Sequence, residues 1–445
     1  MIFDVKEEVT LDEIAEFQKG FAFKSADFQN AGVKVVKVSN LTWDSIDVNS
    51  CICIDASKAG QYSRYELLSN DIVITTVGSW PNNPASVVGK VIKVPAELSH
   101  SLLNQNAVRV RAKKGTNRQY LYYLLKSVFF KDYIIGTAQG SANQASITQN
   151  DIKAFKYLVP SIAKQENIGN SLKVLDEKLE LNIAINKRLE EMAQALFKRW
   201  FVDFEFPNEN GEPYKSSGGE FEESELGLIP KGWKIRSLDD IATLLNGLAM
   251  QKFRPEGSAS IPVIKIKELN QGKTSSDSDK ASPTIDAKYI VNNGDVLFSW
   301  SGTLEIKLWC GGIGGLNQHL FKVTSKEFDK WFYYFWTKNY IEKFRRIASD
   351  KATTMGHIKR SDLKESKVLI PDQNVYQFAT AVLHPIVDKM IQLTTESFEL
   401  EDIRDSLLPK LMTGEIRVSF EREYPLVQNF DLPMAAERKM QYSTT

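Results

Sequence analysis

The sequence has little of what metal and redox sites are built from. Only three cysteines (Cys51, Cys53 and Cys310) and four scattered histidines occur among 445 residues. They lack metal-ligand spacing, and three cysteines are too few for a disulfide framework. There is no Walker-type phosphate-binding loop, no signal-peptide pattern, and no apolar run near the ~18 residues of a membrane span. We therefore expect a cytoplasmic protein with no metal and no ATPase site of its own.

Other catalytic signatures are also weak. The nearest approach to an amino-methyltransferase motif is Asn83-Pro84-Ala85, which lacks the required second proline and aromatic residue. A metal-dependent nuclease site could be drawn through Asp295, Glu305 and Lys307. The repeat described below supplies a counterpart for Asp295 but none for the Glu-x-Lys pair, which favours a framework role for Asp295. Nuclease chemistry stays a minor alternative.

The charge balance is even overall but uneven along the chain. The formal net charge is +0, yet residues 1–160 hold 18 Lys and Arg against 15 Asp and Glu, and residues 235–371 hold 21 against 15. The segments 204–234 and 372–445 lean acidic. An anionic ligand would therefore meet the two basic regions, although so small an excess is also typical of an ordinary solvated surface.

A long amphipathic stretch spans residues 161–203. Apolar residues recur there in steps of three and four, and no proline interrupts them. At ~1.5 Å per residue this helix would be roughly 60 Å long, more than one compact domain needs for its core. It should therefore pack on a partner helix.

A matching stripe lies 211 residues further along. We predict that the two helices pack as an antiparallel coiled coil, each helix following its own globular domain. The alternative is that each is an ordinary amphipathic helix lying on a domain surface. The predicted interface residues are Leu172, Leu175, Leu179, Leu189, Met192 and Leu196 on the first helix, and Leu383, Ile386, Met390, Leu400, Ile403 and Leu407 on the second. Pro385 predicts a kink, or a helix that is straight only from about His384 onward.

The sequence before each helix also repeats. The repeated pieces are Leu11–Ala15 with Leu238–Ala242, Val35–Val38 with Val263–Ile266, Asn70–Ile74 with Gly294–Phe298, and Leu103–Gln105 with Leu316–Gln318. The loops between them differ: Ser45–Glu66 has no clear match in Gly272–Ala287. One scaffold carrying two different recognition surfaces would produce this pattern. Simple drift of the loops would produce it too.

These patterns predict an α+β fold with a pseudo-two-fold internal repeat, in which two similar mixed α/β domains are joined by the helix pair. Two local predictions are a short helix over Val9–Phe17 and a polar connector with little packing over Phe204–Gly219. The expected divisions are a first domain (1–160), first helix (161–203), connector (204–234), second domain (235–371), second helix (372–413) and tail (414–445).

The layout resembles the specificity subunit of a type I restriction–modification system. The motifs that carry the resemblance are LDEIAEFQKGFAFKSADF (11–28), NDIVITTVGSW (70–80), LEEMAQALFKRWFVD (189–203), ESELGLIPKGW (223–233) and LLPKLMTGEIRV (407–418). The resemblance covers nearly the whole chain. It implies that the chain has no catalysis of its own, selects a bipartite sequence in double-stranded DNA, and binds two methyltransferase (modification) subunits, with or without restriction subunits. S-adenosylmethionine, ATP and Mg would then bind those partners.

Candidate DNA contacts are polar, basic or aromatic residues, several of them in corresponding loops of the two repeats. For any single one, a solvated or core role is the alternative. They are Lys19, Lys24, Ser79, Trp80, Asn82, Arg109, Arg111, Lys113, Lys114, Asn143 and Gln144 in the first domain, and Lys252, Arg254, Trp300, Ser301, Lys307, His357, Lys359 and Arg360 in the second. Trp200 and Phe201 are candidates for holding a partner subunit. A protein-interaction adaptor that binds no DNA is the competing function.

Overall fold

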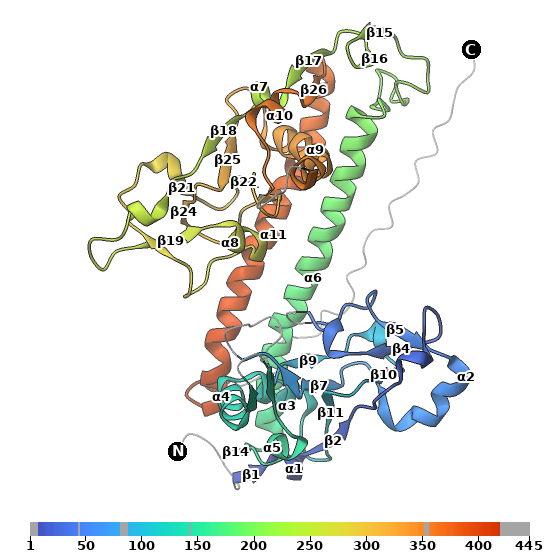
Figure 1. The fold of residues 1–445 in the computed structure, drawn as a ribbon, viewed down its shortest axis with the longest axis vertical. Coiled ribbons are helices and arrows are strands. Elements are labelled where there is room, and N and C mark those ends of the chain that lie inside the picture. Colours follow the sequence, from blue (N-terminus) through green and yellow to red (C-terminus); the bar gives the residue numbers. More distant parts are fainter. Residues whose placement is uncertain (1–7, 43–44, 81–87, 142–143, 351–355, 419–445) are drawn as a thin grey trace, which may run out of the picture. The chain divides into compact units, whose positions relative to one another are not determined.

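The computed structural model describes residues 8–42, 45–80, 88–141, 144–350 and 356–418. The chain divides into two compact units, one formed by residues 1–173 and 406–445 and the other by residues 174–405. Figure 1 labels the main elements of both. The unit boundaries cut through both long helices, so each unit contains one end of each helix.

The first unit is organised around an antiparallel sheet in the order β2-β11-β7-β9. Strand β7 is buried on both faces because its side chains alternate between two cores. Ile72 and Ile74 face the helices, whereas Val73 faces a second sheet, which has five shorter strands. The strand bounds are β2 Ala15–Lys19, β11 Ala107–Ala112, β7 Ile72–Thr75 and β9 Val91–Lys93, and for the second sheet β3 Phe28–Gln29, β5 Ile52–Ile54, β4 Val33–Val36, β10 Ser101–Leu103 and β6 Glu66–Leu67.

Shorter elements complete this unit. Strand β1 (Glu8–Thr10) pairs with β14 (Lys156–Leu158), just before the first long helix. The remaining elements are β8 Val77–Gly78, β12 Gln139–Ser141 and β13 Gln144–Ser146, with helices α1 Leu11–Ile14, α2 Ala56–Ala59, α3 Arg118–Lys126, α4 Val128–Thr137 and α5 Gln149–Lys153. The predicted helix over Val9–Phe17 is wrong. Only one turn forms there, and the chain on either side extends to pair with β14 and β11.

The second unit has the same plan. Its main sheet runs β18-β25-β22-β23, and its second sheet β20-β19-β24-β21. The strand bounds are β18 Thr243–Asn246, β25 Leu320–Thr324, β22 Val296–Ser299, β23 Ile306–Leu308, β20 Lys280–Ala281, β19 Ile261–Ile264, β24 Gly314–Leu316 and β21 Ile290–Val291. The other elements are β15 Phe221–Ser224, β16 Gly227–Pro230, β17 Lys234–Ser237 and β26 Lys367–Ile370, with helices α7 Leu238–Ile241, α8 Ile266–Gln271, α9 Lys330–Asp350 and α10 Arg360–Lys364.

The predicted internal repeat is confirmed by this topology. In both main sheets the strand that precedes the α3 or α9 helix pairs with the two strands that come first along the chain: β11 lies between β2 and β7, and β25 lies between β18 and β22. In both second sheets one pair is parallel while its neighbours are antiparallel, namely β4 with β10 and β19 with β24. So unusual a pairing pattern shared by two stretches of one chain shows that both adopt one scaffold.

A close backbone crossing occurs at the same place in both units. Gly20 and Gly247 follow the first strand of each main sheet. A Cβ on either residue would lie 1.9 Å from the carbonyl oxygen of Asn104 or 2.2 Å from that of Asn317. Only glycine permits this approach. The crossing fixes the Leu-Asn-Gln turn of each repeat against the turn that follows the first strand.

The two long helices are α6 (Ile162–Phe201) and α11 (Gln373–Thr413). Helix α11 is continuous through Pro385 and begins at Gln373, close to the expected bound at 372. The exposed proline ring removes one backbone hydrogen bond but leaves the buried face of the helix unbroken. No helix in the described ranges is long and apolar enough to cross a membrane.

Each unit buries one end of both helices in its own core. In the first unit, Ile168 and Leu172 of α6 share a core with Leu411 and Met412 of α11. In the second, Phe197 and Phe201 of α6 share a core with a run of α11 that includes Leu383 and Met390. The beginning of one helix therefore packs beside the end of the other, as an antiparallel pair requires.

Most of the predicted interface residues face inward. Leu172, Leu179, Leu383, Ile386 and Met390 are buried. The half-buried residues are Leu175, Leu189, Leu196, Leu400 and Leu407.

The prediction is wrong for Met192 and Ile403, because the side chain of each is 46% exposed. The positions that face inward near them are Ala193 on α6 and Arg404 on α11. A seam with regular spacing drifts around a helix of 3.6 residues per turn, so a stripe extrapolated over forty residues leaves the interface in places.

The segment after α6 is also better packed than its polar composition predicts. Phe206 stacks on Tyr214 at 4.5 Å and on Trp233 at 5.1 Å between ring centroids. Phe206 and Trp233 belong to the core of the second unit. The expectation of a loose connector over Phe204–Gly219 is therefore wrong. A few aromatic side chains anchor it although most of its residues are polar.

Candidate nucleic-acid interface

The second unit carries a surface lined with cations and amides. A cavity of about 380 Å³ is lined by Lys265, Lys267, Gln318 and His319, among others. A second cavity of about 350 Å³ shares Lys265 with it and adds Arg254 and Lys280. We call Arg254, Lys265, Lys267, Lys280, Lys359 and Arg360 the basic face of the second unit. Strand β19 and helix α8 position its central lysines, and the Leu-Asn-Gln turn supplies the neighbouring amides.

Trp300 connects this region to a third cavity of about 210 Å³, which Lys359 and Arg360 also line. The indole Nε1 of Trp300 donates to Asn246 at 3.1 Å, and its ring lies 5.9 Å from that of His319. The Ser301 hydroxyl lies 3.1 Å from Nδ1 of the same histidine. Trp300 and Ser301 thus contact His319, which lines the first cavity together with Lys265 and Lys267.

An acidic group also lies in this region. Asp279 lines the second cavity and pairs with Lys265. The hydrogen bond from the lysine holds the pKa of the Asp279 carboxyl below its ordinary value. Both side chains are largely exposed, so a bound phosphate could compete for the lysine at modest cost.

Two further predicted residues of this unit lie near the basic face. Lys252 is exposed on the turn before Arg254. His357 is exposed, forms a bridge with Ser301, and lies edge-on to the Trp300 ring at 6.4 Å.

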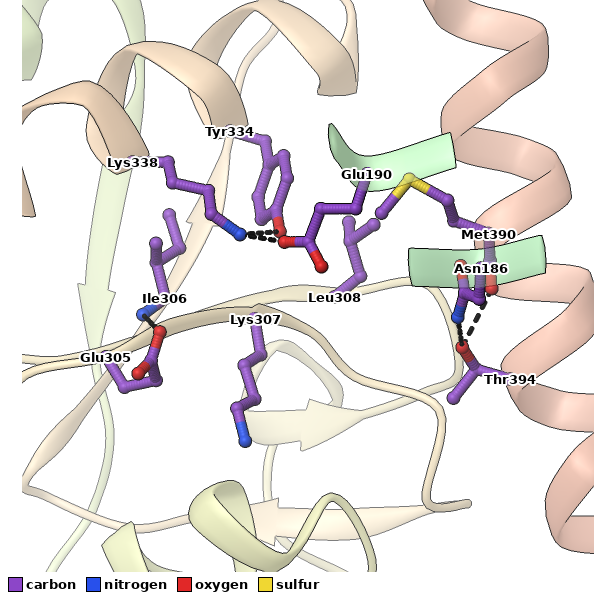
Figure 2. A pocket seen from close by; sticks show the side chains of 10 residues that line it. All are labelled: Asn186, Glu190, Glu305, Ile306, Lys307, Leu308, Tyr334, Lys338, Met390 and Thr394. Atoms are coloured by element: carbon purple, nitrogen blue, oxygen red, sulfur yellow. Dashed lines mark hydrogen bonds and ion pairs between the residues drawn. The ribbon is translucent and has the colours of Figure 1, made fainter. Parts of the chain in front are cut away.

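Lys307 does not belong to this face. It lines a separate cavity of about 310 Å³ beside α6 and α11 (Figure 2). Its Nζ donates to the Asn270 carbonyl at 2.9 Å. Burial lowers the pKa of its ammonium group. The two carboxylates of the alternative nuclease site also form ion pairs within the fold. Asp295 pairs with Lys322 at 2.7 Å, and Glu305 pairs with Arg345 at 2.9 Å.

In the first unit, three predicted phosphate contacts are engaged inside the fold. Arg111 binds the Asp71 carboxylate through two bonds of 2.6 and 2.7 Å. Arg109 donates to the backbone carbonyl of Glu66, and Lys113 donates to that of Asp12. Burial lowers the pKa of Arg109, whereas the bond to Asp71 raises that of Arg111. We remove these three from the candidates because their donors already tie strands and loops together.

The remaining first-unit candidates are closer to solvent. Lys19 and Lys24 are exposed on either side of Phe21, which packs against Tyr62 at 4.9 Å and Tyr65 at 5.1 Å between ring centroids. Other exposed candidates are Lys114 and Gln144, and Ser79 is half-buried.

Trp80 has a structural partner, because its Nε1 donates to the Ser141 carbonyl at 2.8 Å. Asn82 and Asn143 lie outside the described residues. No described cluster of three His, Cys, Asp or Glu side chains could hold a metal ion.

A protein-family model described as the type I restriction modification DNA specificity domain matches residues 4–191 and 230–401. The chain belongs to this family. The match occurs twice because the scaffold occurs twice, once in each repeat. The membership makes the chain a specificity subunit whose role is recognition of a DNA target, rather than a catalytic subunit.

Relatives that cover most of the chain agree. The specificity subunit of the type I restriction enzyme MjaIX from Methanocaldococcus jannaschii is 28% identical over 323 residues, covering 71% of this chain and 73% of its own. A putative MjaX specificity subunit of the same organism is 24% identical over 406 residues, covering 87% and 88%. The crystal structure of a type I S subunit from M. genitalium shares the fold, with a TM-score of 0.54, 16% identity, and 92% and 96% coverage.

Four residues that line the first cavity of this specificity subunit are not among those predicted from the sequence, namely Lys265, Lys267, Gln318 and His319. A signal is present, because Lys265 lies in the repeated Val263–Ile266 piece and Gln318 in the repeated Leu-Asn-Gln turn. Repetition alone, however, indicates a shared framework and not a binding site. The topology places β19 beside β24, and this pairing brings the two repeated pieces together at one surface.

Proposed function

We propose that this specificity subunit reads a two-part sequence in double-stranded DNA, each repeat reading one part. One observation carries the proposal: the main sheets of both units have one strand order, whereas the loops on that scaffold differ. A repeated scaffold supports two equivalent ways of docking on DNA. Different loops then present different donors and acceptors to the base edges, whose pattern in the major groove is unique for each base pair.

Cations of the basic face would hold phosphates and set the orientation of the second unit on the duplex, without selecting sequence. Lys359 and Arg360 suit this role because both are exposed at the start of α10. Base reading would fall to side chains of the divergent loops nearby. The first unit would use the surface around Lys19 and Lys24 in the same way.

The helix pair would fix the distance between the two parts of the site. A helix is stiff along its axis, and each unit grips one end of both helices in an apolar core. The unread spacer should then have one preferred length, near one turn of DNA or somewhat more between the centres of the two parts.

Partner subunits would supply the chemistry. We propose two modification subunits that methylate adenine with S-adenosylmethionine, and restriction subunits that use ATP and Mg where present. Trp200 and Phe201 are buried in the second unit and unavailable to a partner.

A better surface for the modification subunits is an exposed stripe on α6. Val174, Leu181, Ile185 and Met192 are spaced by seven, four and seven residues, so they lie along one face of the helix. That face is distinct from the one that carries the buried Leu179 and Ala193.

Mapping of methylated adenines tests the proposal. The chain is expressed with its modification subunit in cells that lack other adenine methylation, and the methylated positions are sequenced. Two short conserved elements separated by a fixed number of unread base pairs are expected. A single continuous element would contradict the two-reader arrangement.

Salt dependence separates DNA recognition from the adaptor alternative. Binding of the complex to a duplex should weaken steeply as salt rises, because each neutralised phosphate releases counterions. An adaptor without a DNA site would show no duplex binding at low salt.

A further inference from the structure

The middle of the helix pair is joined by polar contacts, in contrast to its apolar ends. Asn182 is 0% exposed, and its Nδ2 donates to Glu396 at 3.0 Å. One turn later, Nδ2 of Asn186 donates to the Thr394 hydroxyl at 2.6 Å. Leu179 and Leu393 are buried in the same stretch. Directional contacts thus share this part of the seam with a few leucines.

A third contact is an ion pair. Arg404 of α11 donates to Asp176 of α6 at 2.9 Å, and the two side chains are only 18% and 13% exposed. As the residue number rises on α6, that of its partner falls on α11, from 404 to 396 to 394. All three contacts therefore belong to a single antiparallel register.

Helix α6 is also tied by charge to the recognition domain of the second unit. Glu190 pairs with Lys338 of α9, whose ammonium also contacts the Tyr334 hydroxyl at 3.2 Å. Figure 2 shows this group one turn along α6 from the Asn186–Thr394 contact. The same short stretch of α6 thus binds α11 and the domain that would read DNA.

Polar contacts and apolar contacts constrain two helices differently. Leucines packing on leucines lose little when one helix shifts by a turn, because another leucine replaces the first and the attraction is non-directional. A buried amide or ion pair loses its partner on such a shift and is left unsatisfied. Single polar residues in coiled-coil seams are known to specify register at a cost in stability.

We propose that Asn182, Asn186 and the Asp176–Arg404 pair are positioning residues that fix the helix register and so sharpen the choice of DNA spacer length. This inference rests on the proposed function. A slip of one turn moves one helix by about 5.4 Å along the other, which is between one and two base pairs at about 3.4 Å each. The register therefore has to be fixed for one spacer to be preferred.

The test uses the full chain in complex with its modification subunit, on DNA carrying the native half-sites at a series of spacers. The variants are Asn182→Leu with Glu396→Leu, Asn186→Leu with Thr394→Leu, and all four together. We expect each to melt near the wild-type temperature, because the leucine pairs add apolar contact while the polar contacts that they replace are only partly buried. We also expect methylation at the best spacer, relative to its neighbours, to fall by roughly tenfold in the Asn182 and Glu396 variant, which loses a charge-assisted hydrogen bond. The fall should be about fivefold in the Asn186 and Thr394 variant, which loses a neutral one.

Leu179→Ala and Leu393→Ala are the matched controls in the same stretch. They should lower the melting temperature and leave the spacer preference as sharp as in the wild type. Both effects differ from those expected of the leucine variants. Glu396→Gln keeps an acceptor for Asn182 and should retain the wild-type preference. If the four-residue variant fails to fold, the two paired variants give the same measurement separately.

Folded Leu variants with the wild-type spacer preference would overturn the inference and leave the proposed function intact. A wild-type complex with no spacer preference would instead overturn the proposed function, and this inference with it.

Discussion

Lengthening both helices should lengthen the DNA spacer. The chain divides between the two compact units after Lys173 in α6 and after Asp405 in α11, so insertions at these two points leave the core of each unit intact. Seven residues are inserted at each point, with leucine at the two seam positions and alanine, glutamate and lysine elsewhere. A heptad keeps the seam on the same face, apart from a drift of about 20°.

The expected change follows from the two helical rises. Seven residues extend each α-helix by about 10 Å at 1.5 Å per residue. That is about three base pairs at 3.4 Å each, so the preferred spacer should grow by three. Three base pairs also turn the DNA by roughly 100° at 10–10.5 base pairs per turn, while the helix seam turns far less. The second unit then meets its half-site at a changed angle, and overall methylation should fall even at the new optimum.

The assay is sequencing of methylated adenines in cells expressing the lengthened chain with its modification subunit. Both half-site sequences should be unchanged, because the recognition loops are untouched. The control carries the insertion in α6 alone. Its helices can no longer pair along their full length, so it should lose stability without gaining a new spacer. A folded, active double insertion that keeps the original spacer would refute the helix pair as the determinant of spacing.

Four further changes test individual contacts. Arg111→Ala should lower the free energy of unfolding by roughly 3 kcal/mol in a denaturant titration, because the carboxylate it binds is 5% exposed and would be left buried without its partner; an unaltered stability would show the pair to be dispensable. The double variant Lys359→Ala with Arg360→Ala should reduce the slope of log binding constant against log salt concentration by about two, without altering the DNA sequence recognised. A changed recognition sequence would show that these residues contact bases. Leu181→Asp should weaken co-purification of the modification subunit while the melting temperature is preserved, since its side chain is exposed; full retention of the partner would exclude this face. Burial raises the pKa of Tyr333 to about 12, so the folded state holds this proton more tightly than the unfolded state, and the resulting stability is present below pH 10 and lost as the pH rises toward 12. Tyr333→Phe should reduce this alkaline loss of stability, measured as the free energy of unfolding from pH 9 to 12. An unchanged pH profile would show that other groups cause the loss.

Patterns local in the sequence predicted the architecture well. The steps of three and four residues indicated both long helices, because burial of one helix face requires that spacing. The offset of 211 residues revealed the repeat, and the matching strand orders confirm it. The helix spacing depends only on neighbours along the chain, and the repeat is found by comparing one stretch of the sequence with another.

Predictions about individual charged side chains fared less well. Arg109 and Lys307 both have the chemistry of a phosphate contact, yet each donates to a backbone carbonyl within the fold. A cation satisfied inside a protein and a cation facing DNA look the same in sequence. Only the position of a carboxylate or carbonyl from a distant segment distinguishes them, as Asp71 does for Arg111.

The sequence by itself determined that there are two scaffolds and two long helices, because periodicity and repetition are properties of the chain. Only the tertiary structure decided which side chains are left to meet DNA or a partner. It buried Phe201, tied up Arg111, and gathered Lys265 and Gln318 at one surface. The physical reason is that the partners of a polar or apolar group are whatever the fold brings next to it. Strand pairing brings together segments separated by some fifty residues, such as β19 and β24.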